Sequence, residues 1–197
     1  GTLFDNLALT GAMDRVAAAG GTLHLLGLVS DGGVHSQLSH LEALVRMAHQ
    51  RGLPRVRVQA VTDGRDTPPT SGVGFLERLQ GFLGAFPNTR IASICGRFYA
   101  MDRDTRWERV QEAYRLYTAG EGRTAQDPVA ALREAYARGE SDEFVRPVVL
   151  PDPGGDGTHR VQAGDAVVCF NFRADRVREI TRAFTARDFA FFPRGPA

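Results

Sequence analysis

The chain has 197 residues, 43% of them apolar and 24% charged, a composition that can bury the core of one α/β domain or of two small ones. Its 24 basic residues nearly balance its 23 acidic ones, so no broad electrostatic field favours nucleic acid or an anionic membrane as a partner. No apolar run is long enough to span a bilayer, and Cys95 and Cys169 each close a β-rich run as buried reduced thiols do, so we expect a cytoplasmic protein.

Helical and strand-like patterns alternate through the first half of the chain. A helix is predicted at about 6–19, where a Gly-Gly pair ends it, and the apolar run at 22–29 predicts a strand. After a glycine-rich turn at 30–35, apolar residues recur at helical spacing from 38 to 48 and complete a β-loop-α unit. Two more units follow, with strands at 55–61 and 90–95, loops at 62–70 and 96–103, and helices at 72–86 and from about 104. Three consecutive units predict a parallel sheet.

The second half of the chain begins with a further helix. Asp127 and Pro128 are typical of an N-cap and a first turn, and Gly139 would end that helix. Segments 144–150 and 158–162 flank a turn at 151–157 and predict an antiparallel excursion near 144–163. A strand at 166–172 and a helix at 173–186 complete the chain. The expected fold is therefore α/β, a mainly parallel open sheet flanked by helices with that short excursion, as one domain spanning 1–197.

Four of the predicted strands end in loops rich in polar residues, at 30–36, 62–67, 96–104 and 171–176. Ligands of an open parallel sheet bind beyond the carboxyl ends of its strands, where these loops converge. The candidate site residues are His35, Arg65, Asp66, Arg97, Arg103, Arg173 and Arg176. Guanidinium groups a few ångströms apart repel by about 4 kcal/mol per pair at an effective dielectric constant near 20, so we predict a ligand with several negative charges.

Two local features support an anionic ligand. Arg173 and Arg176 lie three residues apart at the predicted helix start, and the arginine fork binds carboxylate or phosphate in two places at once. Glycines at 32, 33, 64 and 96 would let the backbone approach a phosphate closely. None of the loops is a Walker or dinucleotide fingerprint, which disfavours ATP and NAD.

Each of these residues also has an ordinary structural explanation. All 24 basic residues are arginine, so a single arginine is weak evidence for a site. His35 could cap the next helix, Asp63 and Asp66 could be turn residues, and the arginines could form solvated pairs with nearby aspartates. A stand-alone anion-binding module without catalysis and a nucleic-acid binder remain alternatives. The coincidence of four such loops at one sheet edge favours an anion site.

The same loops resemble a known family. Residues 29–36 read Val-Ser-Asp-Gly-Gly-Val-His-Ser, and residues 63–69 read Asp-Gly-Arg-Asp-Thr-Pro-Pro. Residues 96–104 read Gly-Arg-Phe-Tyr-Ala-Met-Asp-Arg-Asp, and residues 170–176 read Phe-Asn-Phe-Arg-Ala-Asp-Arg. In this order they are similar to the hallmarks of cofactor-independent phosphoglycerate mutases, although Val29 and Phe98 replace the commoner Leu and Tyr.

The resemblance implies a two-domain isomerase of glycolysis that interconverts 3-phosphoglycerate and 2-phosphoglycerate through a phosphoserine on a phosphatase-like domain with two Mn²⁺ ions. It implies that this chain is the substrate-binding, phosphotransferase domain and lacks the phosphatase-like domain, its serine, its metal ligands and a family lysine. We therefore expect no cofactor or metal in this chain, no mutase activity from it alone, and termini that lie close together.

The resemblance also assigns roles to the candidate residues. The arginines would hold the phosphate and carboxylate of the substrate, and Asp66 and His35 would move protons at the glycerate hydroxyls. The substrate-binding set carried over in this way is His35, Arg65, Asp66, Arg97, Arg103, Arg173 and Arg176.

Overall fold

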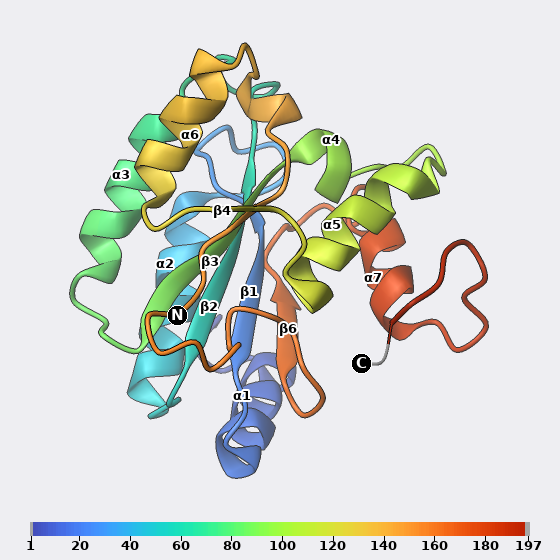
Figure 1. Cartoon of the computed structure of the whole chain (residues 1–197). Coiled ribbons are helices and arrows are strands. Elements are labelled where there is room, and N and C mark those ends of the chain that lie inside the picture. Colours follow the sequence, from blue (N-terminus) through green and yellow to red (C-terminus); the bar gives the residue numbers. More distant parts are fainter. Residues whose placement is uncertain (1, 196–197) are drawn as a thin grey trace.

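The computed structural model describes residues 2–195 and places a six-stranded sheet between two layers of helices (Figure 1). The strands lie in the order β4-β5-β3-β2-β1-β6. Their bounds are β1 Leu23–Leu28, β2 Val56–Thr62, β3 Thr89–Gly96, β4 Arg123–Thr124, β5 Val148–Val149 and β6 Ala166–Cys169. Of the neighbouring pairs, β3 with β5 is antiparallel and the others are parallel, which confirms the predicted fold class.

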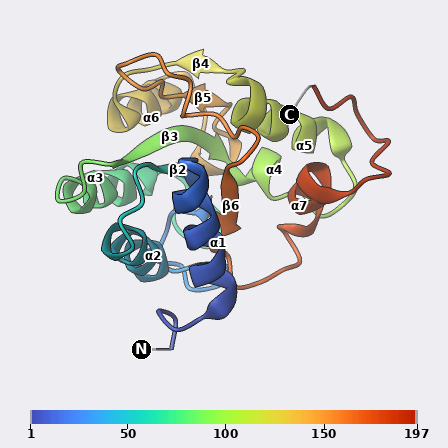
Figure 2. The same cartoon turned by 90° about the horizontal axis from the view of Figure 1, so that it is seen from below.

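The helices divide between the two faces of the sheet. One layer holds α1 (Leu7–Ala19), α2 (Leu38–Gln50), α3 (Gly72–Leu83) and α6 (Pro128–Ala137), which share one apolar core with the sheet. The other holds α4 (Arg97–Ala100), α5 (Trp107–Ala119) and α7 (Arg178–Thr185), which share a second core. Figure 2 shows α1 and α2 on the opposite side of the strands from α5 and α7. Because helices cover both faces, the central strands are buried throughout.

The ends of the predicted helices follow from local chemistry. The side chain of Asn6 accepts hydrogen bonds from the first N–H groups of α1, and Gly20, with φ of 65°, ends that helix in the left-handed region. Asp127 caps α6 by accepting from the N–H of Ala130, and Pro128 occupies the first turn. These helices lie where the sequence predicts them.

The antiparallel excursion predicted near 144–163 is confirmed for its first segment, because β5 pairs antiparallel with β3. Its second segment is wrong: residues 158–162 form no strand, and the other neighbour of β5 is β4. The reason is that Thr158 and His159 bind polar side chains of β2: the Thr158 hydroxyl accepts from Arg57 at 2.8 Å, and the His159 carbonyl accepts from Gln59 at 2.9 Å. Polar groups on the sheet thus hold this segment as a loop.

Two further expectations are wrong. The last helix begins at Arg178 rather than at 173, because the Asn171 side chain and the Phe172 backbone are already bound to the first strand and its loop. The Asn171 carboxamide accepts from the Leu28 N–H at 2.9 Å, and the Phe172 N–H donates to the His35 carbonyl at 2.8 Å. The ends themselves, residues 1 and 196–197, lie outside the described residues, but the described segments next to them lie on different sides of the molecule rather than close together (Figures 1 and 2).

Gly64 and Gly96 approach a neighbouring chain segment and not an open cleft. The 3₁₀ helix η1 (Asp142–Phe144) packs across the ends of β2 and β3, and a Cβ on Gly64 would lie 2.7 Å from the amide nitrogen of Glu143. A Cβ on Gly96 would lie 2.7 Å from the amide nitrogen of Val145. Close packing therefore explains both glycines, where the sequence suggested phosphate.

Replacing Gly96 by alanine should lower the free energy of unfolding by about 1–3 kcal/mol, because the new methyl group must displace backbone. Gly81→Ala on α3 is the matched control, since a Cβ there has no neighbour within 4 Å. That change should be neutral or stabilising by up to about 1 kcal/mol. Urea unfolding of both variants measures the difference, and equal effects would contradict the packing argument.

Within residues 2–195, no helix combines the length and the apolar character that crossing a membrane requires.

Candidate anion-binding site

A cavity of about 360 Å³ lies beyond the carboxyl ends of β2 and β3. It is bounded by α4, the loop that follows α4, η1 and the segment before α7. Its charged lining consists of six arginines and three acids: Arg65, Arg97, Arg103, Arg106, Arg109, Arg176, Asp102, Asp104 and Glu143. The lining therefore has more positive than negative groups, which suits an anion.

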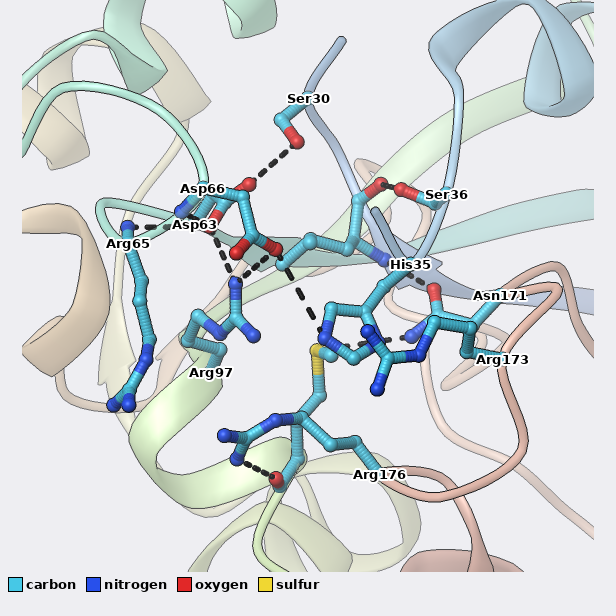
Figure 3. Close-up of polar contacts among 12 residues, drawn as sticks. Ser30, His35, Ser36, Asp63, Arg65, Asp66, Arg97, Asn171, Arg173 and Arg176 are labelled. Atoms are coloured by element: carbon cyan, nitrogen blue, oxygen red, sulfur yellow. Dashed lines mark hydrogen bonds and ion pairs between the residues drawn. The ribbon is translucent and has the colours of Figure 1, made fainter. Parts of the chain in front are cut away.

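Arg97 is the buried anchor of this site. It is 3% exposed, and its Nη1 donates to Asp63 Oδ1 at 2.6 Å and to Asp66 Oδ2 at 2.7 Å (Figure 3). Because α4 begins at Arg97, directly after β3, the guanidinium enters the site from the strand end. Two carboxylates thus fix its orientation.

Asp63 organises the loop after β2, although the sequence suggested an ordinary turn residue. It is 1% exposed and accepts from the Ser30 hydroxyl at 2.7 Å and from the N–H groups of Arg65 and Asp66 at 3.2 and 3.0 Å. Burial alone would raise the pKa of Asp63, but the hydrogen bonds from Ser30, the Asp66 N–H and Arg97 together lower it. Asp63 is therefore an ionised positioning group, and its place directly after a buried strand was the signal for it.

His35 lies beside Asp66 and Asp175 without hydrogen-bonding to either. The ring is 3% exposed, with Nε2 3.9 Å from Asp66 Oδ2 and Nδ1 3.8 Å from Asp175 Oδ1. Within residues 2–195, neither His35 Nδ1 nor Asp175 Oδ1 has a hydrogen-bond partner. Burial, followed by the charges of Arg97 and Arg173, lowers the pKa of His35 below 6.5, against the opposing effect of the two aspartates. At neutral pH the imidazole is uncharged and can accept a proton.

The remaining predicted arginines are less tightly held. Arg103 and Arg173 both donate to Asp175 Oδ2, at 2.8 and 3.1 Å, and Arg65 donates to Glu143 at 3.3 Å. The side chains of Arg65, Arg103 and Arg173 are 57%, 44% and 47% exposed, so they can turn towards a ligand. Arg176 donates to the Met101 carbonyl at 3.2 Å while its buried Nε has no partner. Burial, together with nearby arginines, lowers the pKa of Arg176.

The structure thus brings the sequence-predicted residues together. Arg65, Arg97, Arg103 and Arg176 line the cavity. Figure 3 shows His35, Asp66 and Arg173 close to three of them, Arg65, Arg97 and Arg176. One part of the prediction needs correction, because carboxylates already offset much of the repulsion that was expected to require a ligand. The acids that do so are Asp63, Asp66, Glu143 and Asp175.

Sequence reasoning missed Arg106 and Arg109, which also line the cavity. Arg109 follows Arg106 by three residues at the start of α5, the spacing that places two side chains on one side of a helix. Arg109 lies over the Phe98 ring, 3.7 Å from its centroid. As for metals, no group of three or more His, Cys, Asp or Glu side chains within residues 2–195 is arranged to hold an ion.

The lowered pKa of His35 predicts how stability depends on pH. As the pH falls below about 6.5 the unfolded chain takes up a proton before the folded chain does, so the stability present above 6.5 is progressively lost. His35→Gln should reduce this loss, although His159, whose pKa is also lowered mainly by burial, keeps part of it. Urea unfolding between pH 5 and 8 measures the change. If the stability of His35→Gln fell as steeply towards acidic pH as that of the unchanged protein, this prediction would be contradicted. The control is His49→Gln, at the exposed end of α2.

Comparison with known proteins agrees with the geometry. Residues 1–197 match the family described as BPG-independent PGAM N-terminus. The chain is 50% identical over 193 residues to a 2,3-bisphosphoglycerate-independent phosphoglycerate mutase of Syntrophotalea carbinolica, covering 98% of this chain and 37% of the relative. It is 51% identical over 195 residues to the Myxococcus xanthus protein of the same name, covering 99% and 38%.

A solved structure shows the same fold. The crystal structure of Leishmania mexicana phosphoglycerate mutase at low cobalt concentration superposes with a TM-score of 0.87 and 33% identity, covering 99% of this chain and 39% of that one. The chain thus spans less than two fifths of the length of these relatives. On the match of its full length and on identities near 50%, the chain belongs to the BPG-independent PGAM N-terminus family.

Proposed function

We propose that residues 1–197 form the substrate-binding, phosphotransferase domain of a 2,3-bisphosphoglycerate-independent phosphoglycerate mutase that interconverts 3-phosphoglycerate and 2-phosphoglycerate. The observation that carries this proposal is the cavity lined by six arginines beside an uncharged, buried His35. Phosphoglycerates carry a phosphate and a carboxylate, and the arginine fork binds both groups in two places at once. A role in glycolysis would place the protein in the cytoplasm.

The proposal divides the work between anchored and mobile arginines. Arg97 is fixed by Asp63 and Asp66 and would present a preset donor to the substrate. Among the described residues, the acidic partners of Arg65, Arg103 and Arg173 are only partly buried, so an incoming phosphate or carboxylate could replace these acids as their partner. The carboxylates of the site thus neutralise these guanidinium groups until a ligand takes their place.

Asp66 and His35 are the proposed proton-transfer groups. Moving a phosphoryl group between the two hydroxyls of glycerate requires one hydroxyl to lose a proton and the other to gain one. The Asp66 carboxylate lies at the site, 3.9 Å from His35, and the uncharged imidazole can accept or pass on a proton. Phosphoryl transfer otherwise depends on placement and on neutralisation of charge, which the arginines would supply.

The phosphorylated serine and two Mn²⁺ ions would belong to the part of the relatives' length that this chain does not span. The residues described here offer no set of ligands for such ions, so no step within this chain is assigned to a metal. On this proposal the chain alone should bind phosphoglycerate weakly and catalyse no interconversion, because half of a closed site is missing.

Calorimetric titration with 3-phosphoglycerate tests the binding part of the proposal. Measurable binding at millimolar or lower concentration supports it, and its absence at millimolar concentration contradicts it. Adding the remaining part of the Myxococcus xanthus relative as a separate polypeptide tests the catalytic part. Recovered mutase activity supports a catalytic domain, whereas binding that never leads to activity would favour a stand-alone anion-binding module.

A further inference from the structure

Two buried acids join the loops that carry the cavity arginines. Asp102 directly precedes Arg103 and is 5% exposed. Glu179 lies in the first turn of α7, three residues after Arg176, and is 7% exposed. Glu179 was not singled out in the sequence, Asp102 was considered there only as a pairing partner of the arginines, and neither acid is a candidate proton-transfer group.

The two acids hold three consecutive backbone N–H groups after Arg103. Asp102 Oδ2 accepts from the N–H groups of Asp104 and Arg106, each at 2.9 Å. Between them, the Thr105 N–H donates to Glu179 Oε1 at 2.9 Å. Thr105 has φ of 60° and is the one residue other than glycine with a positive φ in residues 2–195. A threonine keeps this strained conformation only where its surroundings impose it, and the bond to Glu179 is such a constraint.

The second oxygen of Glu179 indicates a bound proton. Glu179 Oε2 is buried and has no hydrogen-bond partner among residues 2–195. Its carboxyl group lies beside that of Asp102, because the two acids accept from adjacent backbone N–H groups, those of Asp104, Thr105 and Arg106. Burial, then the contacts with Asp102 and Asp104, raise the pKa of Glu179, and the Thr105 N–H opposes them.

We assign the proton to Glu179, whose Oε2 lacks a partner among the described residues. Both oxygens of Asp102 already have contacts: Oδ2 accepts from two backbone N–H groups, and Oδ1 lies 3.7 Å from Arg106, before α5, and 3.6 Å from Arg109, within α5. A protonated Glu179 would donate through Oε2 to Asp102 while its other oxygen still accepts from Thr105. Every buried polar atom of the pair then has a partner.

We propose that a carboxylic acid at Glu179, hydrogen-bonded to the Asp102 carboxylate, clamps the loop of Arg103 to α7 and so sets the spacing of Arg103 and Arg176 across the cavity. Glu179 is a positioning residue that acts through the loop. A pKa raised above the ordinary 4.5 means that the clamp's contribution to stability is present below pH 4.5 and is lost as the pH rises through the folded-state value. Two adjacent carboxylates then repel and release the Thr105 N–H.

The clamp can be tested without any ligand. A ¹³C NMR titration of the Glu179 side-chain carboxyl, assigned by its loss in Glu179→Gln, should give a midpoint above that of exposed glutamates. Exchange of the Thr105 N–H with solvent should accelerate over the same pH range, beyond the ordinary base catalysis seen for other protected N–H groups. The proposal would be overturned if the Glu179 carboxyl titrated with a midpoint at or below 4.5. It would also be overturned if the exchange rate of the Thr105 N–H did not change over the pH range of that titration.

Variants separate the clamp from a merely structural role. Glutamine copies the protonated acid, since its NH₂ group can donate to Asp102 and its oxygen can accept from Thr105. Glu179→Gln should therefore keep Thr105 protected at all pH values, whereas Glu179→Ala should lose that protection. Glu108→Gln, in the exposed first turn of α5, removes the same charge and should behave as the unchanged protein does. Equal loss of protection in Glu179→Gln and Glu179→Ala would overturn the clamp.

A second readout rests on the proposed function. At a pH below the Glu179 midpoint, affinity for 3-phosphoglycerate should fall about tenfold in Glu179→Ala and stay within about twofold in Glu179→Gln, because small displacements of binding groups have large effects. If the NMR results support the clamp but 3-phosphoglycerate does not bind the unchanged protein, then the proposed function fails and the clamp stands. If 3-phosphoglycerate binds but the NMR results show an ordinary carboxylate, then the clamp fails alone.

Discussion

Replacing Arg97 by alanine is expected to lower the free energy of unfolding by about 3–5 kcal/mol, because it removes one partner of a buried ion pair. The guanidinium of Arg97 and the carboxylate of Asp63 are both almost completely buried, 2.6 Å apart. Without Arg97, Asp63 keeps its bonds to Ser30 and to two backbone N–H groups but loses its only charged partner among the described residues. Urea unfolding at pH 7 measures the loss.

Arg78→Ala is the matched control for this experiment. Arg78 donates to Glu42 at 3.0 Å with its side chain 52% exposed, so its removal should cost no more than about 1 kcal/mol. Similar losses in the two variants would contradict the claim that the buried pair anchors the site. At acidic pH the difference in the free energy of unfolding between the unchanged protein and Arg97→Ala should become smaller, because protonation of Asp63 removes the charge that Arg97 neutralises.

Replacing Arg173 and Arg176 together by alanine is expected to weaken 3-phosphoglycerate binding by roughly 100-fold or more. Hydrogen bonds to charged groups contribute about 1.5–3 kcal/mol each, and about 1.4 kcal/mol corresponds to tenfold in affinity. The Nε of Arg176 is buried without a partner, and Arg173 donates only to the half-buried Asp175. Both guanidiniums therefore have donors to offer a ligand.

The control is the double change Arg133→Ala with Arg138→Ala, at α6 on the other face of the sheet. It removes the same charge from exposed surface pairs with Glu77 and Glu140. Affinity should then stay within about threefold of the unchanged protein, since distant surface charges are screened. If both double changes weakened binding equally, the effect would be general electrostatics rather than contact at a site. If the change of Arg173 and Arg176 left the affinity for 3-phosphoglycerate unchanged, these two residues would not belong to the binding site.

Most of the fold could be predicted from the sequence because its determinants are local. Alternation of apolar runs with 3.6-residue periods marked the parallel units, and capping residues such as Asn6 and Asp127 marked helix ends. The same periodicity wrongly extended the last helix back to 173. Bonds from Asn171 and Phe172 to residues more than 130 positions away override the local preference there, and no local pattern reveals them.

The candidate site, too, could be predicted from the sequence only in part. The chain order of strands and loops was enough to bring Arg65, Arg97, Arg103 and Arg176 to one cavity, because parallel strands direct their carboxyl ends to a common edge. It did not reveal that carboxylates already pair with most of these arginines. Ion pairing depends on distances of a few ångströms between side chains, which chain order does not contain.

By itself the sequence determined the α/β class, the strand ends at which the polar loops meet, and the family to which those loops belong. Only the tertiary structure decided which acid is buried against which arginine, that Asp63 anchors a site rather than merely turning a chain, and that Glu179 faces Asp102. The reason is physical: periodicity and capping act over a few neighbouring residues, whereas burial, which sets the charge and pKa of these groups, depends on segments that meet only when the chain has folded.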